Sequence, residues 1–94
     1  MSELILKIIT PKGSLGPFPC DSIHLSVADN VDNKGGGSYG IRKGHTNALL
    51  ALEKGCIKAF SSKGNILTGN CGDGFATVDE NTVTVVVEYY NDNN

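Results

Sequence analysis

The sequence has few cysteines, no excess of basic residues and no long apolar run, and each shortage excludes a class of protein. Eight Lys and Arg against ten Asp and Glu give a formal net charge of −2. A domain that binds nucleic acid or an anionic membrane surface is expected to be basic instead, because it must neutralise phosphates. The longest uninterrupted apolar run, residues 48–52, is too short to span a bilayer. These observations argue against a nucleic-acid partner and against direct membrane insertion.

The cysteines Cys20, Cys56 and Cys71 are odd in number and lie far apart. A secreted disulfide scaffold usually has an even and denser set. The first residues do not resemble a secretory signal, because Glu3 and Lys7 interrupt the apolar ones. We therefore expect reduced thiols and a cytoplasmic location.

Length and composition predict one globular domain. Ninety-four residues, 39% of them apolar and 19% charged, suffice for one modest core but not for two independent domains. Twelve glycines and three prolines divide the chain into short segments, as in a protein with many turns.

The apolar pattern of these segments predicts β-strands. Residues 4–10 are rich in Leu and Ile and end at a Pro-Lys-Gly turn, and in residues 21–27 apolar and polar side chains alternate. Polar turns at 61–65 and 79–81 each separate two strand-like runs and so predict two hairpins. Residues 14–20 contain two prolines and can form only an irregular or edge segment.

The sequence pattern alone does not decide between a β-sandwich and a small barrel, or between strand and helix for residues 46–55. Many short strands with a turn every eight to twelve residues or so argue for a β-sandwich or a small barrel. Residues 46–55 nevertheless have the N-cap candidate, the helix formers and the terminal glycine of a two-turn helix. Residues 29–37 are polar and end in three glycines, which predicts a mobile loop.

The glycines Gly35, Gly37 and Gly40 fit the Gly-x-Gly-x-x-Gly spacing of a dinucleotide-binding loop. That loop needs a strand before it and a helix after it, so that the pyrophosphate meets the helix N-terminus. Here a polar loop precedes the glycines. Asp29 and Asp32 in the same loop do not match the EF-hand spacing. We therefore expect no cofactor and no calcium site.

The cysteines and histidines give no clear catalytic or metal site. Cys20 and His24 are four apart, but a zinc site needs two further ligands, and Cys56 and Cys71 are isolated from each other. A Cys–His nucleophile pair is possible by composition, yet no local motif supports it. His45 follows a glycine, and a ring hydrogen bond that closes the turn would explain it by pattern alone. We predict no catalytic, metal-binding or cofactor-binding residues.

A longer motif around that histidine carries a family resemblance. Residues 37–50, Gly-Ser-Tyr-Gly-Ile-Arg-Lys-Gly-His-Thr-Asn-Ala-Leu-Leu, resemble the Gly-x-x-Gly-x-x-x-Gly-His-x-x-x-Leu-Leu signature of the F-type ATP synthase epsilon subunit. Three further segments are similar to the family and follow in its order: Ile-Ile-Thr-Pro at 8–11, Leu-Glu-Lys-Gly-Cys-Ile at 52–57, and Gly-Phe-Ala-Thr-Val with Asn-Thr-Val-Thr-Val at 74–85.

The resemblance implies a fold and a function. The fold is all-β: a single β-sandwich of about ten short strands over residues 1–90, similar to the N-terminal domain of epsilon subunits, with a polar tail at 91–94. Residues 47–52 are then strand rather than helix. The function is non-catalytic: a rotor component of the central stalk that joins the gamma subunit to the c-ring of a proton- or sodium-translocating synthase. The resemblance also implies a peripheral location on the cytoplasmic side of a bacterial membrane. The residues expected at the interface with gamma and the c-ring are Thr10, Ser38, Tyr39, Ile41, Arg42 and His45.

The chain departs from the family in three places. The loop at 29–36 is longer than usual, and we expect it to be a c-ring contact. Asp73-Gly74 stands where the family has Gly-Gly. The C-terminal helical hairpin, which binds ATP in some members, is absent, so no ATP binding is expected, and the polar tail favours a naturally short form. Two other functions stay open: a stand-alone β-sandwich interaction module and a small enzyme with a Cys–His site.

Overall fold

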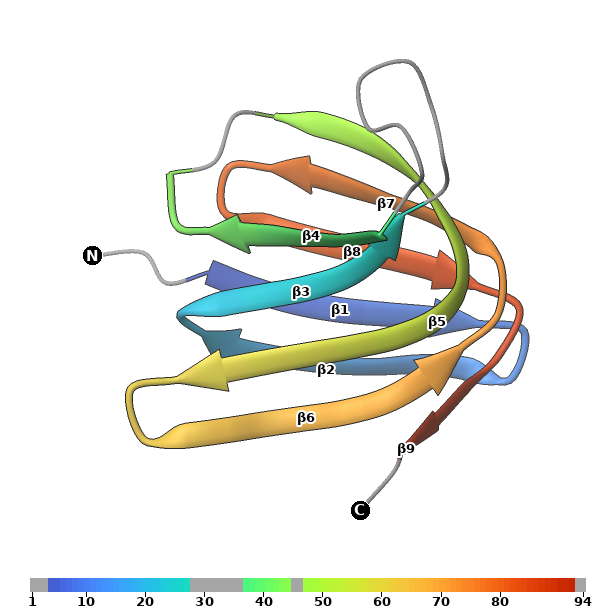
Figure 1. The fold of residues 1–94 in the computed structure, drawn as a ribbon, viewed down its shortest axis with the longest axis horizontal. Coiled ribbons are helices and arrows are strands. Elements are labelled where there is room, and N and C mark those ends of the chain that lie inside the picture. Colours follow the sequence, from blue (N-terminus) through green and yellow to red (C-terminus); the bar gives the residue numbers. More distant parts are fainter. Residues whose placement is uncertain (1–3, 28–36, 45–46, 93–94) are drawn as a thin grey trace.

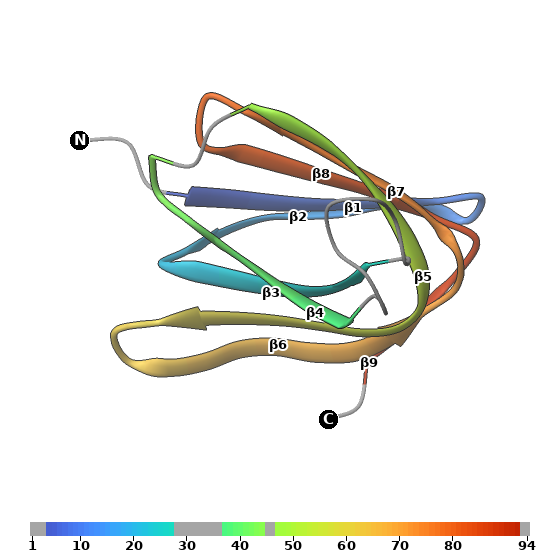
Figure 2. The same cartoon turned by 45° about the horizontal axis from the view of Figure 1, so that its top comes forward.

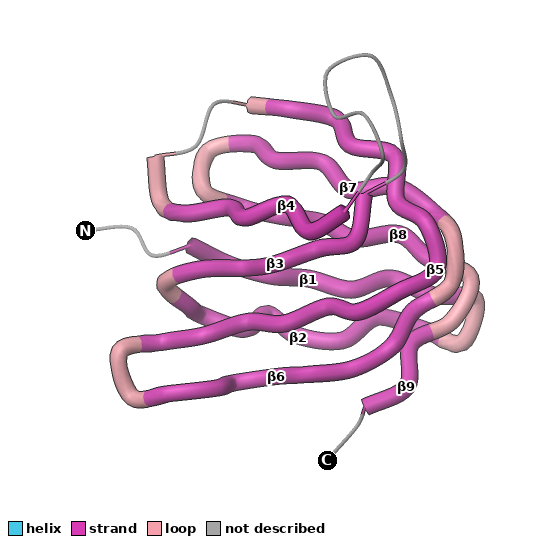
Figure 3. The backbone as a smooth tube through the Cα atoms, viewed as in Figure 1, coloured by secondary structure: helices cyan, strands magenta, loops and turns pink. Residues whose placement is uncertain are grey.

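The computed structural model describes residues 4–27, 37–44 and 47–92, and within these ranges the chain consists of strands and turns (Figure 1, Figure 3). The predicted all-β class is therefore confirmed. In the same ranges there is no helix capable of crossing a membrane. The strands are β1 (Leu4–Thr10), β2 (Gly13–Cys20), β3 (Ser22–Val27), β4 (Gly37–Arg42), β5 (Ala48–Ser61), β6 (Gly64–Cys71), β7 (Gly74–Asp79), β8 (Thr82–Val87) and β9 (Tyr90–Asp92).

The strands form two layers that share the long strand β5 (Figure 2). The first sheet has the order β2-β1-β8-β7-β5, and residues 48–52 of β5 pair with β7. The second sheet has the order β4-β3-β5-β6-β9, and the second half of β5 pairs with β3 and β6. Between these halves β5 curves from one layer into the other, so the two sheets are one curled sandwich.

Alternating side chains from both layers fill the space between them. In β8, for example, Val83, Val85 and Val87 are buried while the residues between them are partly exposed. Because successive side chains on a strand point to opposite faces, this alternation gives each sheet one buried face. The buried core residues are Leu4, Leu6, Ile8, Cys20, Ile23, Leu25, Ile41, Leu52, Ile57, Ala59, Leu67, Cys71, Ala76, Val78, Val83, Val85 and Val87. Among the described residues, no polar or charged side chain is buried with them.

The segment with local helix propensity is a strand. Residues 48–52 pair in register with residues 74–78 of β7, and Leu52 is buried while Leu50 packs against the core. Helix propensity differs by less than about 1 kcal/mol per residue among ordinary amino acids, so tertiary pairing and burial outweigh it here. The strand implied by the family resemblance is confirmed, with Asn47 just before its start.

The edges of the two sheets also bear on the predictions. β2, the segment with two prolines, is an edge strand, and its register with β1 shifts between Leu6 and Ile8. This confirms the predicted edge segment.

Asn91 and Asp92, expected in a polar tail, instead belong to β9, because the edge of β6 offers them backbone partners. The loop predicted at 29–36 lies outside the described residues.

Both predicted hairpins are present, and the second one anchors a neighbouring connection. Glu80 and Asn81 join β7 to β8 with positive φ angles of 49° and 65°, as in a two-residue type I′ turn. The side-chain oxygen of Asn81 accepts a hydrogen bond from the N–H of Gly44 at 2.8 Å. The side-chain oxygen of Asn47 accepts one from the N–H of Glu80 at 3.2 Å. These bonds tie the connection between β4 and β5 to the β7–β8 turn.

Candidate partner interface

The predicted interface residues lie in two separate places. Thr10 ends β1, where its hydroxyl donates to the carbonyl of Gly13 and accepts from the N–H of Lys12, each at 3.2 Å. The other described members are all on β4: Ser38, Tyr39, Ile41 and Arg42. β1 and β4 end on opposite sides of the molecule, with their arrowheads at right and left in Figure 1. The structure therefore does not bring Thr10 and Arg42 together.

The side chains on β4 differ in exposure, and one prediction needs correction. Ile41 is 0% exposed and belongs to the core, because it points into the sandwich. A fully buried side chain cannot contact a partner, so Ile41 is a core residue. Tyr39 is half-buried against the same core, whereas Arg42 is exposed. Only the backbone of Ser38 is described, and His45 lies outside the described residues.

An apolar row crosses the outer face of the first sheet, a surface that the sequence analysis did not identify. Ile9 on β1 lies directly opposite Val86 on β8, which lies opposite Phe75 on β7. Phe75 in turn lies opposite Ala51 on β5. Directly opposite residues point to the same face, and in antiparallel pairs their Cβ atoms are about 4.5–5.5 Å apart. Ile9, Val86, Phe75 and Ala51 are called the apolar row below.

The apolar row is accessible to solvent. Phe75 is 44% exposed and Ile9 is 39% exposed. Leu49, two residues before Ala51, lies opposite Thr77 and is 73% exposed, so it enlarges the apolar surface at the β5 side. Contact of apolar surface with water is unfavourable, and contiguous exposed apolar patches are typical of surfaces that bind another protein. The outer face of the first sheet is therefore the best candidate interface in the described part of the chain.

Consecutive apolar residues in the sequence indicate the apolar row, although they interrupt the alternating pattern from which the strands were predicted. β8 ends in three consecutive valines, and Ile8 and Ile9 are adjacent on β1. Consecutive apolar residues are typical of a strand that is covered on both faces. Here the sandwich covers only one face, so Val86 and Ile9 are left on the other.

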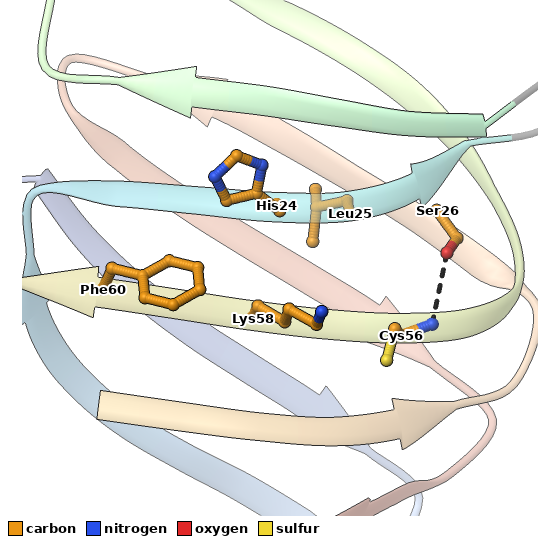
Figure 4. Close-up of a pocket in the computed structure, with 6 residues that line it drawn as sticks. All are labelled: His24, Leu25, Ser26, Cys56, Lys58 and Phe60. Carbon is orange, nitrogen blue, oxygen red and sulfur yellow. Dashed lines mark hydrogen bonds between the residues drawn. The ribbon is translucent and has the colours of Figure 1, made fainter. Parts of the chain in front are cut away.

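The outer face of the second sheet is polar and hollowed. A cavity of about 340 Å³ lies over β3 and β5 (Figure 4), and its lining residues are His24, Leu25, Ser26, Cys56, Lys58 and Phe60. The rings of His24 and Phe60 meet edge to face, with centroids 5.6 Å apart and planes at 78°. The hydroxyl oxygen of Ser26 accepts a hydrogen bond from the N–H of Cys56 at 3.2 Å.

This cavity gives no support to a Cys–His nucleophile. Cys56 and His24 both line it, but within the described residues no hydrogen bond joins them. The Cys56 thiol instead donates to the amide oxygen of Asn70 at 3.9 Å. His24 lies opposite Lys58, not opposite Cys56. The arrangement lacks the paired base that would activate the sulfur.

The other two cysteines are core residues. Cys20 and Cys71 are buried, and burial raises the pKa of the Cys71 thiol, which lowers its reactive thiolate fraction. Cys20 faces the core while His24 lines the outer cavity, so this pair does not converge on a metal. Within the described ranges, no cluster of three or more His, Cys, Asp or Glu side chains could hold a metal ion.

The fold and the exposed apolar row define an all-β sandwich with an exposed apolar surface on one sheet. No protein-family model matches the chain, and no curated protein sequence matches it. Among solved structures, the chain is similar to a chain of the Euglena gracilis mitochondrial ATP synthase, in its OSCP/F1/c-ring structure in rotational state 1. The TM-score is 0.78 with 18% sequence identity, over 96% of this chain and 53% of that chain. The present chain thus spans about half the length of that one.

A second similar chain comes from the central stalk/c-ring structure of the Tetrahymena thermophila mitochondrial ATP synthase. The TM-score is 0.71 with 20% identity, over 97% of this chain and 67% of that chain. At these identities the similarity establishes a shared fold along nearly the whole chain.

Proposed function

We propose that this chain is a non-catalytic central-stalk subunit of an F-type ATP synthase, of the epsilon type, which joins the gamma subunit to the c-ring. The observation that carries the proposal is the fold match over 96% and 97% of the chain to chains from two ATP synthase complexes. The epsilon-like motifs between residues 8 and 85 support the same assignment. Such a subunit is peripheral to the membrane and is held there through the c-ring. The coupling ion, proton or sodium, and the cytoplasmic side of a bacterial membrane belong to this proposal.

The geometry suits a rotor connector. A part that transmits torque needs a stiff body with contact surfaces, and a close-packed sandwich core supplies stiffness. We propose that gamma covers the apolar row, because burial of Phe75, Ile9 and Leu49 removes exposed apolar surface from water. The contact positions suggested by the resemblance are kept in the proposal, without the buried Ile41: Thr10, Ser38, Tyr39, Arg42 and His45.

Purification of the ATP synthase from the source organism tests the proposal. A tagged copy of the chain is expected to co-purify with gamma and c-ring subunits through detergent extraction and size-exclusion chromatography. An interface of this kind should bury at least about 1,200 Å² in total, enough to survive both steps. If the chain elutes alone while the synthase elutes without it, the proposal is wrong, and a stand-alone interaction module becomes the better account.

The proposed role includes no nucleotide site. We expect no heat from titration of the chain with ATP at concentrations up to about 100 μM, which corresponds to a binding free energy weaker than about −5.5 kcal/mol. Saturable binding below that concentration would contradict this part of the proposal.

A further inference from the structure

The outer face of the second sheet carries two adjoining hollows that meet at His24. His24 on β3 lies directly opposite Gly40 on β4 and Lys58 on β5. A Cβ atom at Gly40 would be 3.5 Å from the imidazole Cε1, so the ring leans over the glycine. On its other side the ring meets the ring of Phe60, which comes from β5 (Figure 4). The imidazole is thus held in the middle of the face, with space on both sides.

The second hollow continues from His24 across β4. Its volume is about 500 Å³, and its lining residues are His24, Gly40, Arg42, Lys43 and Gly44. Ser22, the neighbour of His24 on the same face of β3, lies opposite both Arg42 and Phe60. The imidazole therefore lies between Gly40 on one side and the larger side chains of Lys58 and Phe60 on the other. Together the two hollows form a shallow channel across three strands.

The charges around this channel have one sign. Lys58 lines one hollow and Arg42 and Lys43 line the other, whereas no Asp or Glu lines either. Within the described residues none of these three cations forms a salt bridge. The whole chain has a net charge of −2, so three cations without an acidic residue in these linings give this face a local charge of the opposite sign.

We propose that this channel docks an extended acidic segment of a partner protein, whose carboxylates contact Arg42, Lys43 and Lys58 on either side of His24. Carboxylates are the natural partners of guanidinium and ammonium groups. The small number of cations also favours an acidic protein segment over anionic lipid or nucleic acid. A surface that binds anionic lipid typically has at least about four clustered Lys or Arg, and nucleic-acid binding requires a more basic domain. The three cations are spread over two hollows, an arrangement that fits a chain with several carboxylates better than a single small ion.

The inference goes beyond the proposed function. The channel lies on the second sheet, whereas the apolar row lies on the outer face of the first sheet. Binding of an acidic segment in the channel therefore does not depend on binding of gamma to the apolar row. The test below uses neither gamma nor the c-ring. If the peptide does not bind, the proposed function is unaffected. If the chain does not co-purify with the synthase, the proposed acidic-segment site is unaffected.

Titration of the full chain with a hexaglutamate peptide tests this inference, with NMR shifts of the backbone amides as the signal. At low ionic strength the peptide is expected to shift signals of β3, β4 and the second half of β5, and added salt should weaken binding because exposed charges are screened. Lys58→Glu and Arg42→Glu should each weaken binding at least about fivefold, because each replaces an attraction by a repulsion. The matched control Lys12→Glu lies in the β1–β2 turn, is also exposed and should change binding less than about twofold.

Several outcomes would overturn the inference. It is wrong if hexaglutamate does not bind, if Lys12→Glu weakens binding as much as Lys58→Glu, or if the shifted signals lie on the first sheet. Vesicles of anionic lipid and inorganic phosphate serve as competing probes. Tighter binding of either one than of hexaglutamate would assign the channel to a lipid headgroup or a free phosphate instead. Because Lys58 and Arg42 are on different strands, either variant suffices if the other fails to fold.

Discussion

The carbonyl oxygen of Val86 occupies the place where a Cβ atom of residue 74 would stand, so only glycine fits at Gly74. Gly74 begins β7 and pairs with Val87 at the end of β8. The obstructing atom is backbone, which cannot rotate away as a side chain could.

Substitution of Gly74 by alanine is expected to lower the free energy of unfolding by about 1–3 kcal/mol, because β7 and β8 must move apart to admit the methyl group. Gly40→Ala is the matched control within a strand. Its added Cβ would be 3.5 Å from His24, an ordinary contact, so its effect should stay below about 0.5 kcal/mol. Urea unfolding followed by circular dichroism measures both. Equal stability of the two variants would contradict the close approach of Gly74 to Val86.

The hydroxyl of Tyr90 is buried and has no hydrogen-bond partner among the described residues. A buried unpaired hydroxyl costs about 1–3 kcal/mol, and removing it can be neutral or stabilising. We therefore expect Tyr90→Phe to leave the free energy of unfolding unchanged or to raise it by about 1 kcal/mol. Tyr89→Phe, at an exposed neighbour, should have no measurable effect. A loss of more than about 1 kcal/mol in Tyr90→Phe would mean that the hydroxyl has a partner in solution.

The same burial raises the pKa of Tyr90 to about 12, and the negative charge of Asp92 adds to the increase. The ordinary tyrosine pKa is about 10, so the protonated phenol is favoured in the folded state. Its contribution to stability is therefore complete below about pH 10 and is lost as the pH rises toward about 12. Absorbance titration should show a tyrosine component that ionises near pH 12, and Tyr90→Phe should remove that component. A titration curve that Tyr90→Phe leaves unchanged in that pH range would contradict this prediction.

The cysteines should differ in reactivity. Cys20 and Cys71 are buried and Cys56 is partly exposed, so a thiol reagent should modify one cysteine of the native chain quickly and all three after unfolding. In Cys56→Ser the fast phase should disappear. Fast modification of two or more native thiols would show that the core opens more readily than the described packing implies.

The sequence predicts much of the fold because its signals are local. Alternation in residues 21–27 and polar turns at 61–65 and 79–81 each depend on neighbouring residues, and the structure has the strand Ser22–Val27 and both hairpins at these places. Residues 48–52 are different, since their strand conformation depends on pairing with β7, which is distant in sequence. Local propensity favoured a helix there, and only the family resemblance indicated a strand. β9 was missed for the same reason, because polar residues such as Asn91 gain their structure from the edge of β6.

The candidate interface was harder to predict than the fold. Ile9, Val86 and Phe75 come from three strands, and only the register of β1, β8 and β7 places them side by side. No spacing along the chain encodes that register. Ile41 was assigned to the interface because it lies within the motif, but its side chain is fully buried and fills the core.

Calorimetric titration with the cognate gamma subunit tests the proposal that this chain is a rotor subunit docked to gamma through the outer face of the first sheet. The unmodified chain should bind at micromolar concentration or tighter. Leu49→Glu, beside the apolar row, should weaken binding at least about tenfold, which corresponds to about 1.4 kcal/mol. Leu15→Glu, the same substitution at a 42% exposed leucine on β2 outside that row, should weaken it less than about twofold. No binding of the unmodified chain, or equal losses in the two variants, would contradict the account.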